Sequence, residues 1–339
     1  MRMPFSRRGS PALSLALQGG GAHGAFTWGV LDALLESGVP IAAMSGASAG
    51  AMNAVVLAHG LAEGGADAAR AGLEAFWRAV AERMPPLWHV PGDPPRLTGV
   101  GQAWLAWSRW LAPSQLNPLD MNPLREVLAE QIDFRRVRGH RDGPALFVSA
   151  TDVAHGRLRL LRRREMTLDA LLASACLPQI AHPVLLSGRA HWDGAFSANP
   201  ALFPLLHEAD DLMIVTLGTL RDQPLPSSGA EIAARTLEIG FNASFLREAR
   251  WLAELADAGR GLAGWWRGGG IERRLARLRW HLIDADDAVG ALPSATRLVP
   301  ERDFLLRLRD QGREAALQWW RGGSFGRRSS VDMLRTFGA

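Results

Sequence analysis

The sequence contains neither lysine nor tyrosine, so all 38 basic residues of this 339-residue chain are arginine. Without lysine there can be no Schiff base, no Ser–Lys hydrolase and no phosphate-binding P-loop lysine, and without tyrosine there can be no phenolic acid or base. A nucleophile in this chain can therefore take its base only from aspartate, glutamate or histidine.

The same two absences explain a basic isoelectric point of about 10.7. Few groups titrate between histidine and arginine, so a formal net charge of only +4 moves the isoelectric point far upward. Residues 1–220 balance 19 arginines against 19 acidic residues, and the surplus lies in residues 221–339. A nucleic-acid binder needs a clustered basic face and a recognisable module, so we expect no nucleic-acid partner.

Cysteine and long apolar runs are also scarce. Cys176 is the single cysteine, which excludes an intramolecular disulfide and favours a reducing compartment. The most apolar stretch, residues 41–58, is interrupted by serine, glycine and asparagine and falls short of a membrane span. We therefore expect a cytoplasmic protein that can associate peripherally with a membrane.

Hydrophobic patterning predicts a parallel α/β sheet. Residues 13–17 and 41–45 are expected strands, and each runs through a glycine-rich turn into a helix, at 25–36 and 49–58. Further strands are expected at 145–151, 157–161, 184–186, 190–192 and 212–217, the last of them the final core strand. We expect three parts, namely a disordered N-terminus (1–11), an α/β catalytic domain (12–220) and a helical, arginine-rich region packed on the core (221–339).

The first glycine-rich turn is compatible with two kinds of site. Gly19-x-Gly21-x-x-Gly24 fits a dinucleotide-binding fingerprint, but the next strand does not end in the acidic residue that would bind a ribose. A tight turn without a ligand would need fewer glycines. Exposed backbone N–H groups at a helix N-terminus are also what an oxyanion hole requires.

The second turn, Gly46-Ala47-Ser48-Ala49-Gly50, has the pattern of a nucleophile elbow. A serine at a sharp strand-to-helix turn needs small neighbours to avoid clashes, and its hydroxyl then projects above the sheet. Small-residue pentapeptides also arise by chance in a chain with 36 glycines. The position between an expected strand and an expected helix favours the functional interpretation.

Several residues could supply the base that such a serine needs. Asp193-Gly194-Ala195 follows a short expected strand, although an Asp-Gly pair can also be a simple turn. His182, His191 and His207 lie late in the chain, where a catalytic triad could place its histidine. None of the nine histidines has the spacing of a metal site, and no metal is expected.

Taken in order, the three motifs resemble the patatin-like phospholipase family. Ser174-Ala175-Cys176-Leu177-Pro178 and Asn199-Pro200 add to the resemblance, which covers about residues 12–220. It implies a three-layer α/β/α fold with a mostly parallel central sheet, and a Ser–Asp dyad in which Ser48 is the nucleophile and Asp193 the base. It also implies an oxyanion hole in the loop formed by Gly19, Gly20, Gly21, Ala22, His23 and Gly24, and no cofactor.

The function implied by this resemblance is lipid acyl hydrolysis through an acyl-enzyme, with a phospholipid or related ester as substrate. Two alternatives remain open. One is a carboxylesterase acting on a neutral lipid, a short ester or a storage polyester, and the other is a catalytically silent lipid- or nucleotide-binding module. The oligomeric state is left open.

The sequence departs from the family at His23, where members usually carry arginine or lysine. Imidazole is mostly uncharged at neutral pH unless its pKa is raised. We consider two hypotheses: activity depends on a protonated His23, or a charge at this position is dispensable.

Two segments suggest contact with a membrane. Trp104, Trp107 and Trp110 recur every third residue, as in a helix packed on the core, an amphipathic cap or an interfacial face. Residues 271–280 are expected to form a basic amphipathic helix, either as a solvated face or as a contact with anionic lipid.

Overall fold

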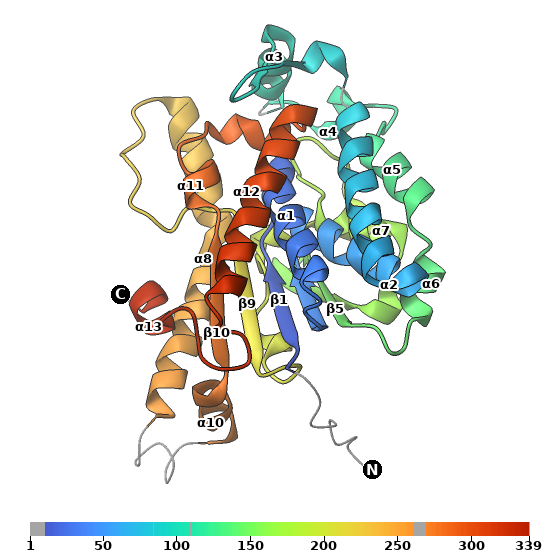
Figure 1. Ribbon diagram of the computed structural model, residues 1–339. Coiled ribbons are helices and arrows are strands. Elements are labelled where there is room, and N and C mark those ends of the chain that lie inside the picture. Colours follow the sequence, from blue (N-terminus) through green and yellow to red (C-terminus); the bar gives the residue numbers. More distant parts are fainter. Residues whose placement is uncertain (1–10, 84, 109, 261–268, 339) are drawn as a thin grey trace.

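The computed structural model describes residues 11–83, 85–108, 110–260 and 269–338 (Figure 1). Residues 1–10 of the N-terminal segment expected to be disordered lie outside this description. The fold is mixed α/β with a mostly parallel eight-stranded central sheet.

The sheet brings together strands from both ends of the chain. Its order is β10 (Arg279–Asp284), β9 (Asp211–Thr216), β1 (Leu13–Leu17), β2 (Ile41–Gly46), β5 (Ala145–Asp152), β8 (Arg189–Asp193) and β7 (Val184–Leu186), and β6 (Arg157–Arg162) also pairs with β5. The five strands from β10 to β5 are parallel, whereas β6, β7 and β8 pair antiparallel. The motifs that follow β1 and β2 therefore meet at one edge of the sheet.

Alternating side chains of the strands enter two separate hydrophobic cores. Met213 and Val215 belong to one core, and Leu212 and Ile214 belong to the other. The period of two along a strand produces this division. It places a helical layer on each face of the sheet, so the expected three-layer α/β/α arrangement is confirmed.

The first core is covered by helices from the N-terminal and middle parts of the chain and by one long C-terminal helix (Figure 1). These are α1 (Gly24–Glu36), α2 (Ala49–Glu82), α5 (Pro123–Gln131), α6 (Phe134–Gly139), α7 (Leu168–Ser174) and α12 (Arg302–Arg321). The second core is covered by α8 (Gly229–Ala258), α10 (Gly270–Arg277) and α13 (Met333–Phe337).

Several connecting segments lie at the carboxyl edge of the parallel strands, which is the upper edge of the sheet in Figure 1. They include the two-stranded ribbon β3 (His89–Val90) and β4 (Arg96–Leu97), α3 (Gly99–Trp107), α4 (Pro113–Leu116), and α11 (Asp286–Val289). No helix in the described ranges is long and apolar enough to cross a membrane.

The expected strands of residues 13–45 and 145–192 and the helix expected at 25–36 are confirmed to within a few residues. The helix expected at 49–58 begins at Ala49 as expected but extends to Glu82, with a kink at Gly64 and Gly65. The expectation that residues 212–217 are the last core strand was wrong, because β10 lies beside β9 in parallel. The basic helix expected at 271–280 is correspondingly shorter and ends at Arg277.

The reason for this error lies in tertiary contacts. Asp211 is fully buried in β9, and it accepts hydrogen bonds from Arg279 Nη2 at 2.6 Å and His281 Nε2 at 2.9 Å. These polar residues of β10 therefore have a buried partner 68 to 70 positions earlier. Sequence patterning included Arg279 and Trp280 in the expected basic helix because the buried partner, Asp211, is distant in sequence.

Candidate active site

Ser48 occupies the sharp turn between β2 and α2. Its backbone has φ 51° and ψ −125°, a conformation that non-glycine residues rarely adopt and that marks strain at functional turns. The residue is partly exposed although its neighbours Ala47 and Ala49 are buried. The turn therefore presents one hydroxyl at the surface of an otherwise closed segment.

The glycines around Ser48 are required by close backbone contacts. A Cβ atom on Gly50 would lie 2.1 Å from the carbonyl oxygen of Leu17, and one on Gly46 would lie 2.6 Å from the carbonyl carbon of Gly50. Both separations are far below van der Waals contact. The Gly46–Gly50 pattern thus permits the start of α2 to pass directly over the end of β1.

The first glycine-rich turn, residues 19–24, packs directly against this elbow. A Cβ atom on Gly19 would lie 2.9 Å from Ser48 Cβ, and the Gly19 N–H donates to Asn199 Oδ1 at 2.7 Å. Gly21 has φ +59°, and a Cβ atom there would lie 2.2 Å from the carbonyl oxygen of Arg297. Within the described residues, the N–H groups of Gly20 and Gly21 donate to no protein acceptor.

Asp193 ends β8 and lies within hydrogen-bonding reach of the Ser48 hydroxyl. Its side chain is buried, with 1% of the residue exposed, and it accepts a hydrogen bond from Ala195 N at 2.8 Å. Burial raises the pKa of this carboxyl group to about 7, although the hydrogen bonds from Ala195 and Ser48 act in the opposite direction. Asp193 can therefore exchange a proton near neutral pH.

A loop after α7 connects the serine to the aspartate. Ser48 N–H lies 3.1 Å from the Ser174 carbonyl oxygen and 3.0 Å from Ser174 Oγ, and Asp193 N–H donates to the Cys176 carbonyl oxygen at 2.8 Å. The sequence marked residues 174–178 only as part of the family resemblance. The hydrogen bonds by which these residues hold Ser48 and Asp193 could not be predicted from the sequence, because 126 residues separate Ser48 from Ser174.

The three candidate histidines have other partners or face solvent. His182 Nε2 lies 2.9 Å from the Asn117 carbonyl oxygen, His191 Nδ1 lies 2.8 Å from the Arg189 carbonyl oxygen, and His207 is exposed. None of their hydrogen bonds in the described part of the chain reaches Ser48 or Asp193. That part also contains no group of His, Cys, Asp and Glu able to hold a metal ion.

His23 is buried in the glycine-rich turn and is hydrogen-bonded to a residue of the C-terminal region. Its Nε2 lies 2.8 Å from Thr296 Oγ1, and the Thr296 hydroxyl donates its proton to the Pro293 carbonyl oxygen at 2.7 Å. The threonine oxygen can therefore only accept, so Nε2 of His23 carries the hydrogen.

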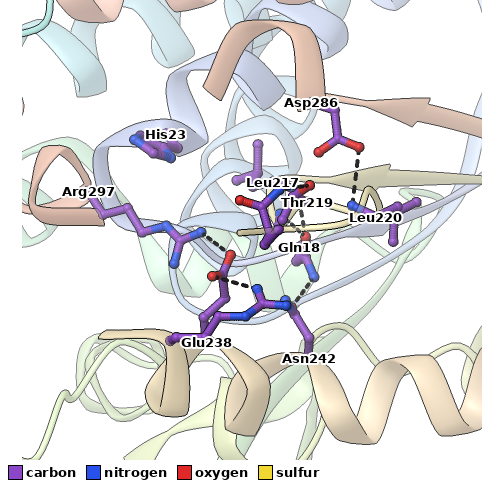
Figure 2. A network of polar contacts seen from close by, with 12 residues as sticks. Gln18, His23, Leu217, Thr219, Leu220, Glu238, Asn242, Asp286 and Arg297 are labelled. Carbon is purple, nitrogen blue, oxygen red and sulfur yellow. Dashed lines mark hydrogen bonds and ion pairs between the residues drawn. The ribbon is translucent and has the colours of Figure 1, made fainter. Parts of the chain in front are cut away.

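The environment of His23 keeps it uncharged. Burial, with a smaller contribution from the nearby charge of Arg297, lowers its pKa to about 3. A ring with this pKa is neutral at pH 7, which favours the hypothesis that a charge at position 23 is dispensable. The permanent positive charge beside this ring belongs to Arg297 (Figure 2).

A polar network joins the glycine-rich turn to α8 (Figure 2). Gln18 Oε1 accepts hydrogen bonds from the N–H groups of Leu217 and Gly218, at 2.5 and 2.7 Å, and its amide nitrogen donates to Asn242 Oδ1 at 2.9 Å. Arg297 Nη2 pairs with Glu238 at 3.1 Å. A cavity of about 430 Å³ lies beside this network, and neither Ser48 nor Asp193 lines it.

The comparison with known families agrees with this geometry. Residues 15–206 match the patatin-like phospholipase family. The chain belongs to the patatin-like phospholipase family. The matched range includes the two glycine-rich turns and Asp193, and it ends before α8 and the C-terminal region.

Other comparisons give little further information. No curated protein matches the chain. Among solved structures, VipD from Legionella pneumophila is similar over 92% of this chain and 67% of its own, with 16% sequence identity and a TM-score of 0.44. Membership of the family supports lipid acyl hydrolysis as the general activity and a lipid as the substrate.

Proposed function

We propose that this protein hydrolyses ester bonds of phospholipids or related lipids with a Ser48–Asp193 dyad. The observation that carries the proposal is the placement of the Ser48 hydroxyl within reach of the buried Asp193 carboxyl group, whose pKa lies near 7. A general base is most effective when its pKa is close to the operating pH. Neither lysine nor tyrosine is available to take this role, and of the candidate histidines His182 and His191 have other partners and His207 is exposed.

In the proposed acylation step, ionised Asp193 removes the proton of Ser48 while the serine oxygen attacks the ester carbonyl carbon. The carbonyl oxygen becomes an oxyanion, which accepts hydrogen bonds from the N–H groups of Gly20 and Gly21. Loss of one such donor typically costs about 3 kcal/mol of transition-state stabilisation. Collapse of the intermediate transfers the proton from Asp193 to the departing alcohol and leaves an acyl group on Ser48.

In the proposed deacylation step, Asp193 takes a proton from water as the water oxygen attacks the acyl carbon. The second tetrahedral intermediate collapses and releases a fatty acid. Asp193 then returns the proton that it took from water to the Ser48 oxygen. The chemistry uses only groups of this chain. A carboxylesterase acting on a neutral lipid, a short ester or a storage polyester would use the same residues. Only the substrate, with or without a phospholipid head group, distinguishes it from a phospholipase.

A fluorophosphonate probe tests this proposal, because it reacts covalently with an activated serine. We expect the probe to label the wild-type protein and not the Ser48→Ala variant, and we expect Asp193→Asn to lose turnover while remaining folded. Ser197→Ala is the control for loss of a nearby serine hydroxyl, since Ser197 lies four residues after Asp193 and its Oγ contacts Thr151 and backbone carbonyls rather than the side chains of the dyad. Labelling of Ser48→Ala, or none of the wild type, would refute the dyad.

A panel of lipids assayed with the wild type and Ser48→Ala then identifies the ester class. Ser48-dependent release of fatty acid from phospholipids supports a phospholipase. Release confined to acylglycerols, short esters or a polyester supports the carboxylesterase.

A further inference from the structure

Exposed large hydrophobic side chains are unevenly distributed over the surface. Among the described residues 17 such side chains are exposed, and 11 of them lie in two short segments, residues 87–121 and 225–239. The first segment contributes Leu87, Val90, Val100, Trp107, Trp110, Leu119 and Met121, and the second contributes Leu225, Ile232, Leu237 and Ile239. Apolar clusters of this kind mark sites of interaction.

Both segments lie at the carboxyl edge of the sheet, where the elbow of Ser48 is. In Figure 1, α3 lies above this edge and α8 begins beside it, whereas α10 lies at the opposite end of the molecule. The first segment contacts the loop that holds the dyad, since Asn117 is hydrogen-bonded to His182. The second adjoins the glycine-rich turn, because Leu225 and His23 line the same cavity.

The tryptophans of the first segment are divided between a half-buried pair and the exposed surface. Trp104 packs edge-to-face on Trp88, with ring centroids 4.9 Å apart. Trp107 at the end of α3 is 60% exposed, and Trp110 beyond it is 84% exposed. Indole rings favour the headgroup region of a bilayer because they combine an apolar body with a hydrogen-bond donor.

The described charged residues of these segments are of both signs, with Asp93, Arg96 and Asp120 in the first and Glu231, Arg235 and Glu238 in the second, so neither presents a strong field of one sign. Asp93 pairs with Arg307, and Glu238 pairs with both Arg235 and Arg297. A surface that is apolar and nearly neutral matches a zwitterionic lipid headgroup better than an anionic one.

The basic helix α10 is a weaker candidate for membrane contact. Arg274 donates to the carbonyl oxygens of Leu206 and Ala209 and to Asp210, so this side chain holds α10 against the core. A membrane bound at α10 would also lie at the end of the molecule opposite the carboxyl edge of the sheet (Figure 1).

We propose that residues 87–121 and 225–239 together form the surface by which the protein docks on a zwitterionic phospholipid bilayer, with Trp107 and Trp110 in the headgroup layer. This inference rests on the proposed function for its choice of a lipid partner. Docking in this orientation presents the dyad to the bilayer, so that an ester can reach Ser48 from the lipid surface.

Sedimentation with phosphatidylcholine vesicles tests the docking surface. The measurements use the Ser48→Ala variant as background, so that no substrate is consumed. We expect the added substitutions Trp107→Ser and Trp110→Ser to lower the partition coefficient about tenfold or more, and Leu225→Asp to lower it independently. Trp251→Ser is the matched control, because Trp251 is 67% exposed but lies in the C-terminal half of α8, which packs against α10 and α13.

Thermal unfolding of each variant shows whether it is folded. Equal partition of the Trp107/Trp110 variant and the background would overturn the proposal, as would equal losses for Trp251→Ser. Binding that requires anionic lipid and is lost with Arg273→Gln and Arg277→Gln would assign the contact to α10 instead. A Trp107/Trp110 variant that changes from dimer to monomer in sedimentation velocity, with unchanged vesicle binding, would identify a second copy of the chain as the occupant.

The outcomes separate this inference from the proposed function. Absence of fluorophosphonate labelling together with tryptophan-dependent vesicle binding would refute the hydrolase and leave the docking surface supported. Fluorophosphonate labelling together with vesicle binding that does not depend on either segment would support the hydrolase and refute the docking surface.

Discussion

His23 in the glycine-rich turn donates a hydrogen bond to Thr296, which lies 273 residues later in the chain. Thr296 belongs to a short 3-10 helix, Ser294–Leu298, that follows α11 and lies outside the range matched by the family. The carbonyl oxygen of the adjacent Arg297 lies against Gly21. The C-terminal region therefore supports the turn that is expected to bind the oxyanion.

The first prediction concerns this support. Thr296→Val keeps the shape of the side chain but leaves the buried Nε2–H of His23 without an acceptor, which typically costs about 1–3 kcal/mol. We expect a lower free energy of unfolding in urea and a lower kcat, since the turn carries Gly20 and Gly21. Ser294→Ala, an exposed position in the same 3-10 helix, should leave both quantities unchanged. Equal effects of the two substitutions would exclude the specific role of Thr296.

The second prediction is that His23 contributes nothing to the pH dependence of activity between pH 5 and 8. Its pKa of about 3 lies well below this range, so the ring stays neutral throughout. His23→Gln retains a donor for Thr296 without a titrating group, and its profile should have the same midpoint as the wild type. A midpoint that moves in His23→Gln or His23→Arg would restore the hypothesis that a protonated His23 is needed.

His23 should also affect stability at low pH. Because the folded pKa is lower than the unfolded value of about 6.5, the unfolded chain binds the proton more readily. Stability is therefore lost as the pH falls from about 6.5 toward 3. The measurement is urea unfolding of the wild type and His23→Gln at pH 4 and pH 7.5. Between pH 7.5 and pH 4, the free energy of unfolding should decrease more for the wild type than for His23→Gln.

Much of the fold of residues 13–216 and of the candidate site could be predicted from sequence because the signals are local. Gly46–Gly50 and Asp193–Ala195 are motifs of five residues or fewer that can be recognised without knowledge of the fold. Alternating or continuous apolar runs predicted the strands beside them. The hydrogen bonds that hold the two glycine-rich turns could not be predicted. Their partners, Thr296, Ser174 and Asn199, lie far from these turns in the sequence. Strand β10 was missed for the same reason, since Asp211 is the buried partner of its arginine and histidine.

The third prediction is that kcat/KM rises with pH and levels off above a midpoint near 7. Asp193 must be ionised to accept the Ser48 proton, and burial raises its pKa to about 7. Below the midpoint, the rate should fall about tenfold per pH unit. A midpoint near 4, the usual value for an aspartate, would show that the carboxyl group is not buried as described.

The same carboxyl group should reduce stability as it ionises. Its folded pKa lies above the unfolded value of about 3.9, so the folded state binds more protons between pH 4 and pH 7. The free energy of unfolding therefore decreases as the pH rises through this range. Asp193→Asn removes the buried charge, and we expect it to be more stable than the wild type at pH 8 by on the order of a few kcal/mol. Equal stability of the two proteins at pH 5 and pH 8 would contradict this.

The last prediction concerns the backbone contact that shapes the elbow. Gly50→Ala places a methyl group where the Leu17 carbonyl oxygen lies 2.1 Å away, and neither backbone segment can move without disturbing β1 or the turn at Ser48. Overpacking of this kind typically costs about 1–3 kcal/mol, and the shift of Ser48 should also abolish fluorophosphonate labelling.

Gly72→Ala in the same helix is the matched control, since its Cβ would lie 3.7 Å from Val56 Cγ1, an ordinary contact. In a helix interior that substitution should stabilise the protein by about 0.5–1 kcal/mol, with labelling retained. Retained labelling in Gly50→Ala would show that the Ser48 turn does not depend on the crossing of β1 and α2.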